Sequence, residues 1–534
     1  MAPNLSTLPV ETLSLILSQF CLHCSKEHDY ESPDGYFRCK THEQQPDQPS
    51  WYSRDYRQTL YSMCLLSKRL TSIAQIFLYH EFVPGYGDAW KSAQFSWDGR
   101  LSSFLRTIAA RRDLAAQVKR IYIHPYLLRA VTEEEAQVTL EDALNAAAAP
   151  GAGVQLSEYL SAFDEMGNQR AFFPGPTRYP GWKLLGMLLT LALNLERLSL
   201  QVDGSGCVPA AAFSALYSLS SSGTVLSNLK TLDFCPHSHG WVFFLKHHAE
   251  GILEAVAASK GSLSTLNLHM CGGIGQVKLQ GLQVLRLTYS RLYSEDLSAL
   301  LDSCRTPGLK SFYYEARHPY MWSACLHDSL RYEGHMQPID AITRLFPHAS
   351  TLTSLHLDLR ARGLANLLID NQGLSEAQTT MARFPVLKHV FLNPTAICNS
   401  QEHRPSVTDD DDQLLTDLLP PNIESLSLAG GVQDAVRARI AKALMHLAKI
   451  VKNGKQFTAL KQVRCDFEMD GGGVLEGYGV SEAFEFAGVD FAYDSLEMSC
   501  GPTLRFGEGT PEREMELGCE MENYSPIPDD DDDL

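Results

Sequence analysis

The hydrophobic positions of the chain recur in a short phrase of the form Leu-x-x-Leu-x-Leu, in which other apolar residues sometimes replace leucine. Nine copies lie between Leu195 and Cys465, and a candidate tenth copy begins at Val118. In the last three positions an apolar residue, a residue of any type and a second apolar residue follow one another. This alternation predicts a short strand that buries the two apolar side chains and exposes the middle one to solvent. The nine copies are Leu195/Leu198/Leu200, Leu229/Leu232/Phe234, Leu263/Leu266/Leu268, Leu282/Leu285/Leu287, Leu309/Phe312/Tyr314, Leu352/Leu355/Leu357, Leu387/Val390/Leu392, Ile423/Leu426/Leu428 and Leu460/Val463/Cys465.

Helical spacing fills much of the chain between these phrases. Apolar residues three or four positions apart predict one helix over Ser294 to Cys304 and another over Val432 to Val451. A unit of one strand and one helix cannot bury its own apolar face, so neighbouring units should stack. We therefore predict an α/β solenoid with parallel strands on the concave side and helices outside. The alternative is an ordinary α/β fold in which these strands are unrelated.

The repeated phrase resembles the leucine-rich repeat family in an irregular form. Consecutive copies begin 19 to 43 residues apart, whereas regular repeats of this family take about 20–29 residues. The resemblance implies a curved sheet whose concave face binds another protein.

The first eighty or so residues lack the phrase and predict three short helices. Leu8-Pro9-Val10-Glu11 suits the start of the first helix, because proline fits the first helical position and glutamate the first turn. A second apolar-periodic stretch runs from Tyr56 to Leu66, and a third from Leu70 to Leu78. Three helices this short cannot bury all of their leucines, so a partner should cover part of the apolar surface.

These N-terminal residues resemble the F-box, in the form found in filamentous-fungal proteins. The resemblance rests on Leu8-Pro9-x-Glu11-x-Leu13, on residues 65–70 (Leu-Leu-Ser-Lys-Arg-Leu) and on residues 72–82, which contain Ile73-Ala74 and Leu78-Tyr79. It implies a non-catalytic substrate receptor of a cullin-based (SCF-type) ubiquitin ligase, whose F-box docks on a Skp-type adaptor while the repeats hold a target protein. The implied adaptor-binding residues are Leu8, Pro9, Leu13, Ile16, Leu65, Leu66, Ser67, Lys68 and Leu70.

The domain organisation follows from these boundaries. We predict an F-box-like domain at 1–82 with an insertion at 21–55, a linker and first repeat-like unit at 83–194, a repeat solenoid at 195–465, an acidic region at 466–524 and a disordered acidic tail at 525–534.

Middle and flanking positions of the strands should project from the concave face and meet the target first. Their side chains are polar, aromatic and of both signs, which suits a protein or peptide partner and not a nucleic acid. The candidate target-binding residues are Arg197, Ser199, Asp233, Asn267, His269, Arg286, Tyr313, Glu315, His356, Asp358, His389, Phe391 and Arg464.

The insertion contains a weak zinc-ligand pattern. Cys21-x-x-Cys24 is followed fifteen residues later by Cys39-x-x-His42, which could complete a tetrahedral zinc site. The Gln/Pro-rich stretch that follows favours a metal-free loop. We therefore expect no cofactor, with zinc on Cys21, Cys24, Cys39 and His42 as the alternative.

Composition narrows the remaining function classes. The net charge is −18, but residues 466–534 hold 20 acidic and two basic residues, so residues 1–465 balance at 43 against 43. This balance gives no basic face for nucleic acid. Alternative functions are an adaptor-independent scaffold and an acidic-tailed binder of a basic chromatin protein.

Cysteine usage and motifs point to an intracellular, non-enzymatic protein. Thirteen scattered cysteines predict reduced thiols. We expect no secretion, because the apolar run from Leu13 to Leu17 lacks a preceding basic region and a small-residue cleavage site. The sequence shows no apolar run long enough to span a membrane and none of the common hydrolase, phosphate-loop or zinc-protease motifs. We expect a cytoplasmic or nuclear location, with an adaptor, a cullin and an unidentified target protein as partners.

Overall fold

The computed structural model describes most of the chain up to residue 496. The described residues are 8–25, 52–86, 95–146, 157–161, 180–202, 216, 225–236, 243–244, 250–259, 263–274, 279–290, 294–304, 308–316, 336, 338–360, 381–394, 397, 412–430, 434–466, 479–494 and 496. The chain divides into two compact units, 1–499 and 500–534, and all of the described residues lie in the first.

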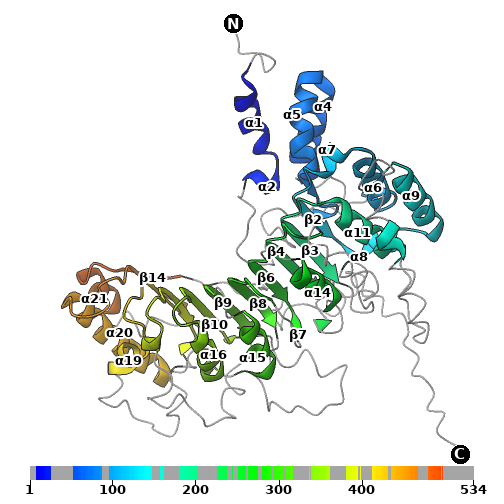
Figure 1. Cartoon of the computed structure of the whole chain (residues 1–534). Helices are drawn as coiled ribbons and strands as arrows, with labels where there is room; N and C mark the ends of the chain where they lie inside the picture. The colour runs from blue at the N-terminus through cyan, green and yellow to red at the C-terminus, as the bar shows by residue number, and fades with distance from the viewer. Residues whose placement is uncertain are drawn as a thin grey trace, which may run out of the picture. The chain divides into compact units, whose positions relative to one another are not determined.

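The centre of this unit is a parallel sheet of twelve strands (Figure 1). Each strand pairs in parallel with the next strand of this sheet along the chain, so sequence order and spatial order agree. In order, the strands are β1 (Glu81–Phe82), β2 (Arg120–Ile123), β3 (Arg197–Val202), β4 (Thr231–Pro236), β6 (Thr265–His269), β8 (Val284–Ser290), β9 (Ser311–Ala316), β10 (Ser354–Asp358), β11 (His389–Leu392), β12 (Ser425–Ala429), β13 (Gln462–Asp466) and β14 (Asp490–Tyr493). A separate two-stranded sheet joins β5 (Phe243–Phe244) and β7 (Cys271–Gly273).

The predicted strands are confirmed. All nine phrases and the candidate tenth form strands β2 to β13, and equivalent phrase positions lie opposite one another. Leu198, for example, pairs with Leu232, which pairs with Leu266. All three leucines are fully buried. The repeated phrase therefore sets the register, because a shift of one residue would turn every leucine to the other face.

Helices pack beside the sheet and share its core. Figure 1 shows α14, α15 and α16 along one side of the sheet. Their apolar residues join the strand leucines in one buried cluster. The predicted helices at 294–304 and 432–451 are confirmed as α15 and α20. The helices that follow β1 are α6 (Arg100–Ala110), α7 (Arg112–Ala115), α8 (Pro125–Arg129), α9 (Glu133–Ala146), α11 (Pro180–Leu191), α14 (Glu250–Ala258), α15 (Ser294–Ser303), α16 (Pro338–Leu345), α19 (Leu414–Leu418), α20 (Asp434–Lys452) and α21 (Val480–Phe486). The protein is thus of the α/β class, with a parallel sheet.

A helical unit precedes the sheet and has its own small core. It contains α1 (Val10–Ser18), α2 (Leu22–Ser25), the π-helix η2 (Tyr52–Arg57), α4 (Gln58–Leu66) and α5 (Lys68–Tyr79). The three predicted helices correspond to α1, α4 and α5, and Ser67 caps α5 by accepting a hydrogen bond from the Leu70 amide at 3.2 Å. The buried residues of this core are Leu13, Leu17, Cys21, Leu60, Leu70, Ile73, Ala74 and Phe77.

Within the described residues, no helix combines the length and apolarity that crossing a membrane would require. The cysteines in the described part of the chain do not form disulfide bonds.

Candidate functional site

The helical unit exposes several large apolar side chains. Leu65 and Leu66, at the end of α4, keep 70% and 65% of their surface in solvent, and Leu15 on α1 keeps 68%. Single exposed leucines are common on protein surfaces, but several exposed apolar side chains close together often mark a site of interaction with another protein. The exposed apolar residues of this unit are Val10, Leu15, Ile16, Tyr61, Leu65, Leu66 and Ile76.

The structure divides the nine adaptor-binding candidates into two groups. Leu13 and Leu70 are buried in the core of the helical unit. Both are needed there to pack α1 and α5 together, so the expectation that they face a partner is wrong. The seven candidates that remain at least partly accessible are Leu8, Pro9, Ile16, Leu65, Leu66, Ser67 and Lys68.

A hydrogen bond connects the residue before α1 to the start of α5. Arg69, in the first turn of α5, donates from Nη2 to the carbonyl oxygen of Leu8 at 2.5 Å, although 61 residues separate them. Leu8 and Pro9 therefore lie beside the corner between α4 and α5, where Leu65 and Leu66 are exposed. We call residues 8–9 and 65–68 the α4–α5 corner.

Sequence reasoning missed four exposed apolar residues of the helical unit, Val10, Leu15, Tyr61 and Ile76. For Leu15 a signal was present. It falls off the buried stripe of α1 that contains Leu13 and Leu17, so its position alone indicates an outward-facing leucine.

The candidate target-binding face contains more buried side chains than expected. The expectation that these residues face solvent is wrong for Ser199, Asp233, Asn267, His269, Glu315, Asp358 and Phe391, all of which are buried. The others are partly accessible or exposed: Arg197, Arg286, Tyr313, His356, His389 and Arg464.

Cross-strand polar contacts explain part of this burial. The Asp233 carboxylate on β4 accepts hydrogen bonds from Arg197 at 2.7 Å and Ser199 at 2.5 Å on β3, and from Asn267 at 2.6 Å on β6. Side chains on one face of adjacent strands lie about 5 Å apart, which suits such direct bonds. These polar residues bond to one another instead of pointing into solvent.

Three aromatic rings stack on neighbouring strands of the same face. His356 on β10 lies between Tyr313 on β9 and Phe391 on β11, with both pairs of ring centroids 3.7 Å apart. Burial of the imidazole lowers the pKa of His356 to about 3. Its neutral form is therefore the one that the fold accommodates.

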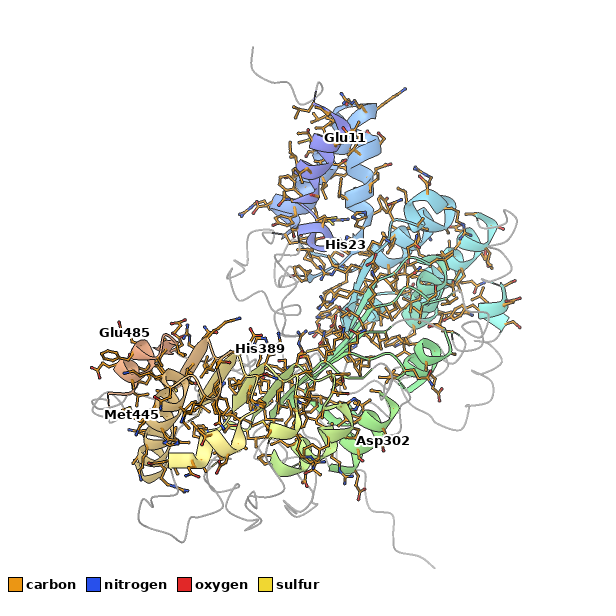
Figure 2. All side chains as sticks on the ribbon, turned by 60° about the vertical axis from the view of Figure 1, so that its left-hand side comes forward. Glu11, His23, Asp302, His389, Met445 and Glu485 are labelled. Carbon is orange, nitrogen blue, oxygen red and sulfur yellow. The ribbon has the colours of Figure 1, made fainter. Side chains whose placement is uncertain are left out.

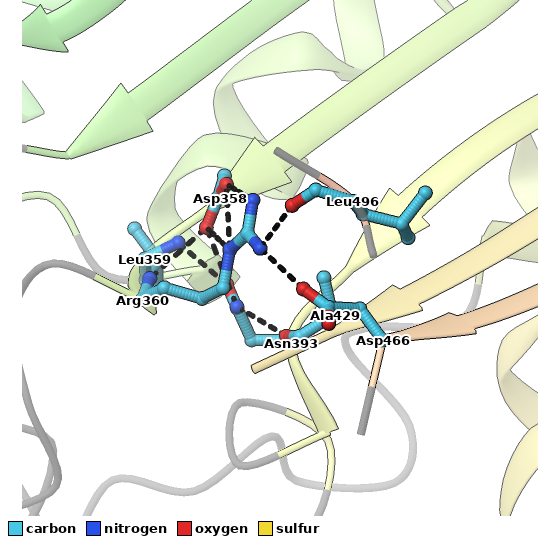
Figure 3. Close-up of polar contacts among 7 residues, drawn as sticks. All are labelled: Asp358, Leu359, Arg360, Asn393, Ala429, Asp466 and Leu496. Carbon is cyan, nitrogen blue, oxygen red and sulfur yellow. Dashed lines mark hydrogen bonds and ion pairs between the residues drawn. The ribbon is translucent and has the colours of Figure 1, made fainter. Parts of the chain in front are cut away.

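Arg360 organises a second polar network that sequence reasoning missed (Figure 3). Its guanidinium contacts the fully buried Asp358 carboxylate at 2.7 Å and Asp466 at 2.6 Å, and also donates to the carbonyl oxygen of Leu496. Burial alone would lower the pKa of Arg360, but hydrogen bonding and the charges of the two aspartates hold it above its usual value. Asn393 extends the network by accepting from the Leu359 amide and donating to the Ala429 carbonyl. The network links the ends of β10 and β13.

A cluster of metal-ligating side chains lies where the helical unit meets the sheet. Cys21, His23, Cys24 and His80 offer two sulfur and two nitrogen atoms that all lie within 4.8 Å of one another. In Figure 2, His23 lies at the end of the helical unit nearer the sheet, and Glu11 at the far end. Cys39 and His42, the other two predicted zinc ligands, lie outside the described residues.

Hydrogen bonding and burial shift the pKa values of the two thiols of this cluster in opposite directions. The buried Glu81 carboxylate accepts hydrogen bonds from the Leu22 amide at 3.2 Å and the Tyr52 hydroxyl at 3.1 Å, and burial raises the pKa of Glu81. A hydrogen bond with Cys24, burial and the charge of Glu81 raise the pKa of Cys21 to about 12. The same bond lowers the pKa of Cys24.

No protein-family model and no curated protein matches this chain. The exposed leucines of the helical unit offer an apolar contact surface, and the Cys/His cluster offers donors for a soft divalent metal.

Proposed function

We propose that this protein is the substrate-recognition subunit of an SCF-type cullin-RING ubiquitin ligase. In this proposal the helical unit is an F-box that binds a Skp-type adaptor, and the sheet with its helices is an irregular leucine-rich-repeat solenoid that binds a target protein. The chain itself performs no catalysis and acts in the cytoplasm or nucleus. The observation that carries the proposal is the exposure of Leu65 and Leu66 at the α4–α5 corner.

The energetics of these leucines support a partner. Fully burying one leucine side chain is worth about 1.5–3 kcal/mol. Single exposed apolar residues are common on protein surfaces, but Leu65 and Leu66 are adjacent and belong to a segment that resembles the F-box. Pro9 and the partly exposed Leu8 lie beside them because Arg69 holds the Leu8 carbonyl. A partner that covered this corner would remove several apolar side chains from water together.

The sheet supports the second half of the proposal. Successive strands of one parallel sheet that follow chain order are what stacked strand-and-helix units produce. Equivalent phrase positions lie opposite one another along most of its length. The candidate target contacts are now the residues of this face that stay accessible and are not enclosed between neighbouring rings, Arg197, Arg286, Tyr313, His389 and Arg464.

Affinity purification of the tagged full-length chain tests the assembly. We expect the adaptor and the cullin to co-purify with the wild-type chain. The double variant Leu65→Asp, Leu66→Asp should lose both, because two carboxylates cannot be buried in an apolar contact without a large desolvation cost. Val138→Asp is the matched control, since Val138 is an exposed apolar residue on α9 outside the helical unit.

Other outcomes of the same purification would favour the alternatives. A chain that brings down neither adaptor nor cullin would be an adaptor-independent scaffold. Deletion of 525–534, which lies outside the described residues, should leave adaptor binding unchanged. Salt-dependent loss of all partners on that deletion would instead indicate an acidic-tailed binder of basic proteins.

A further inference from the structure

Two segments that are far apart in the sequence, residues 21–24 and His80, converge on one point of the helical unit. Cys21 follows α1, His23 and Cys24 lie on α2, and His80 lies between α5 and β1. Cys21 and His80 are buried, while His23 and Cys24 are partly accessible. A spacing of 56 residues separates Cys24 from His80, yet the Cys24 sulfur lies 3.3 Å from His80 Nδ1.

Three sulfur–nitrogen separations in this cluster match the edges of a tetrahedral zinc site. His80 Nδ1 lies 3.6 Å from the Cys21 sulfur, and His23 Nδ1 lies 3.5 Å from the Cys24 sulfur. Zinc bonds of about 2.3 Å to sulfur and about 2.0–2.1 Å to nitrogen, set at the tetrahedral angle, put sulfur and nitrogen about 3.5 Å apart. A single thiol–imidazole hydrogen bond would explain one short sulfur–nitrogen contact. It would not explain why four possible metal-ligating atoms all lie within 4.8 Å of one another.

We propose that Cys21, His23, Cys24 and His80 bind one structural zinc ion. Two cysteines and two histidines complete a closed coordination shell, which is the arrangement of structural and not catalytic zinc. Compared with the alternative zinc set considered from the sequence, His23 and His80 take the places of Cys39 and His42.

The charge of the site permits the ion. Zinc with two thiolates and two neutral imidazoles adds no net charge, so the buried side chains of Cys21 and His80 would not surround an unbalanced charge.

The ion would fix the helical unit to the first strand of the sheet. Its ligands come from α2 at one end and from the residue before β1 at the other. Closing a loop of more than fifty residues in this way restricts the unfolded chain and stabilises the folded one. This inference does not depend on the ligase proposal, since zinc can bind whether or not an adaptor does.

Elemental analysis of the purified full-length chain, after exchange into metal-free buffer, tests the site. We expect about one zinc per chain in the wild type, and cobalt replacement should give the visible absorption of a tetrahedral site with thiolate ligands. Cys21→Ser, His23→Ala and His80→Ala should each lower the zinc content to near zero. Cys64→Ser is the matched control, because Cys64 is a partly accessible cysteine of the same helical unit outside the cluster.

Two results would overturn the proposal. One is a wild-type chain that holds neither zinc nor tetrahedral cobalt after incubation with excess metal. The other is zinc that survives His23→Ala and His80→Ala but is lost in Cys39→Ser and His42→Ala, which would assign the ligands expected from the sequence.

Thiol alkylation of the wild-type chain covers the case in which the variants fail to fold. With zinc bound, Cys21 and Cys24 should resist iodoacetamide, and a chelator should speed their modification about tenfold or more while Cys64 reacts at an unchanged rate. Equal rates for Cys21 and Cys24 with and without chelator would contradict a bound ion.

Discussion

The imidazole of His356 stacks face to face on the phenol ring of Tyr313, with centroids 3.7 Å apart and an angle of 16° between the ring planes. The two residues lie directly opposite each other on β10 and β9. Phe391 covers the other face of the imidazole from β11, also in register. A titratable group is thus held between two aromatic rings, and we expect the stability of this part of the sheet to be sensitive to acid.

The first prediction follows from that stack. An unfolded histidine has a pKa of about 6.5, whereas burial lowers the pKa of folded His356 to about 3. The unfolded chain therefore takes up a proton first as the pH falls, so His356 stabilises the fold above about pH 6.5 and loses this contribution below it. Between pH 7.5 and 5 the loss should be about 2 kcal/mol.

Urea unfolding of the wild type and His356→Phe at the two pH values measures this loss. Phenylalanine keeps the stack without a titratable group, so its stability should fall less on acidification. His389→Phe is the control, because His389 lies on the neighbouring strand β11 but is exposed. An equal acid sensitivity of His356→Phe and the wild type would show that His356 is not the group responsible.

The second prediction concerns Arg360. Arg360→Ala should destabilise the fold by about 3–5 kcal/mol, because it leaves the fully buried Asp358 carboxylate without its cation. Arg360→Lys should cost less, since lysine keeps the charge but cannot make forked bonds to both Asp358 and Asp466. Arg54→Ala, which removes an exposed ion pair with Asp55, should change little. Similar unfolding midpoints for Arg360→Ala and Arg54→Ala would contradict a structural role for the network.

The third prediction concerns the polar contacts between β3, β4 and β6. Asp233→Ala removes the acceptor shared by Arg197, Ser199 and Asn267, and should cost about 3 kcal/mol. Glu424→Gln provides the contrast. The Glu424 carboxylate contacts Lys388 and Lys461 at the surface, and those hydrogen bonds hold its pKa at about 2. Its loss should have a smaller effect that fades in high salt. Salt titration of both variants separates the two behaviours, and a salt-sensitive Asp233→Ala would speak against buried bonds.

The strands could be predicted because each one carries its own signal. Alternation over a few residues identifies a strand wherever it occurs, and the same phrase repeated along the chain fixes how the copies pair. The same holds for α15 and α20, whose apolar residues recur at helical spacing. The positions of these strands and helices are therefore encoded by residues close together in the sequence.

What could not be predicted depends on residues that are distant in sequence. The strand alternation places Asp233 on the solvent-facing side. Its burial depends on bonds to Arg197 and Asn267, which lie 36 and 34 residues away in the sequence. His80 carries no spacing signal of its own, so only the fold brings it to Cys21 and Cys24. Leu13 and Leu65 are both helical leucines that the sequence assigns to the adaptor surface, but the packing of α1, α4 and α5 buries the first and leaves the second exposed.

Titration of the purified full-length chain with a purified Skp-type adaptor tests the central claim most directly. We predict saturable binding by the wild type, unchanged binding by Val138→Asp, and a loss of about 100-fold or more in affinity for Leu65→Asp, Leu66→Asp, since each tenfold change corresponds to about 1.4 kcal/mol and each buried leucine contributes about 1.5–3 kcal/mol. No binding by a folded wild-type chain, or equal binding by the double variant, would contradict the assignment of the α4–α5 corner as an adaptor-binding surface.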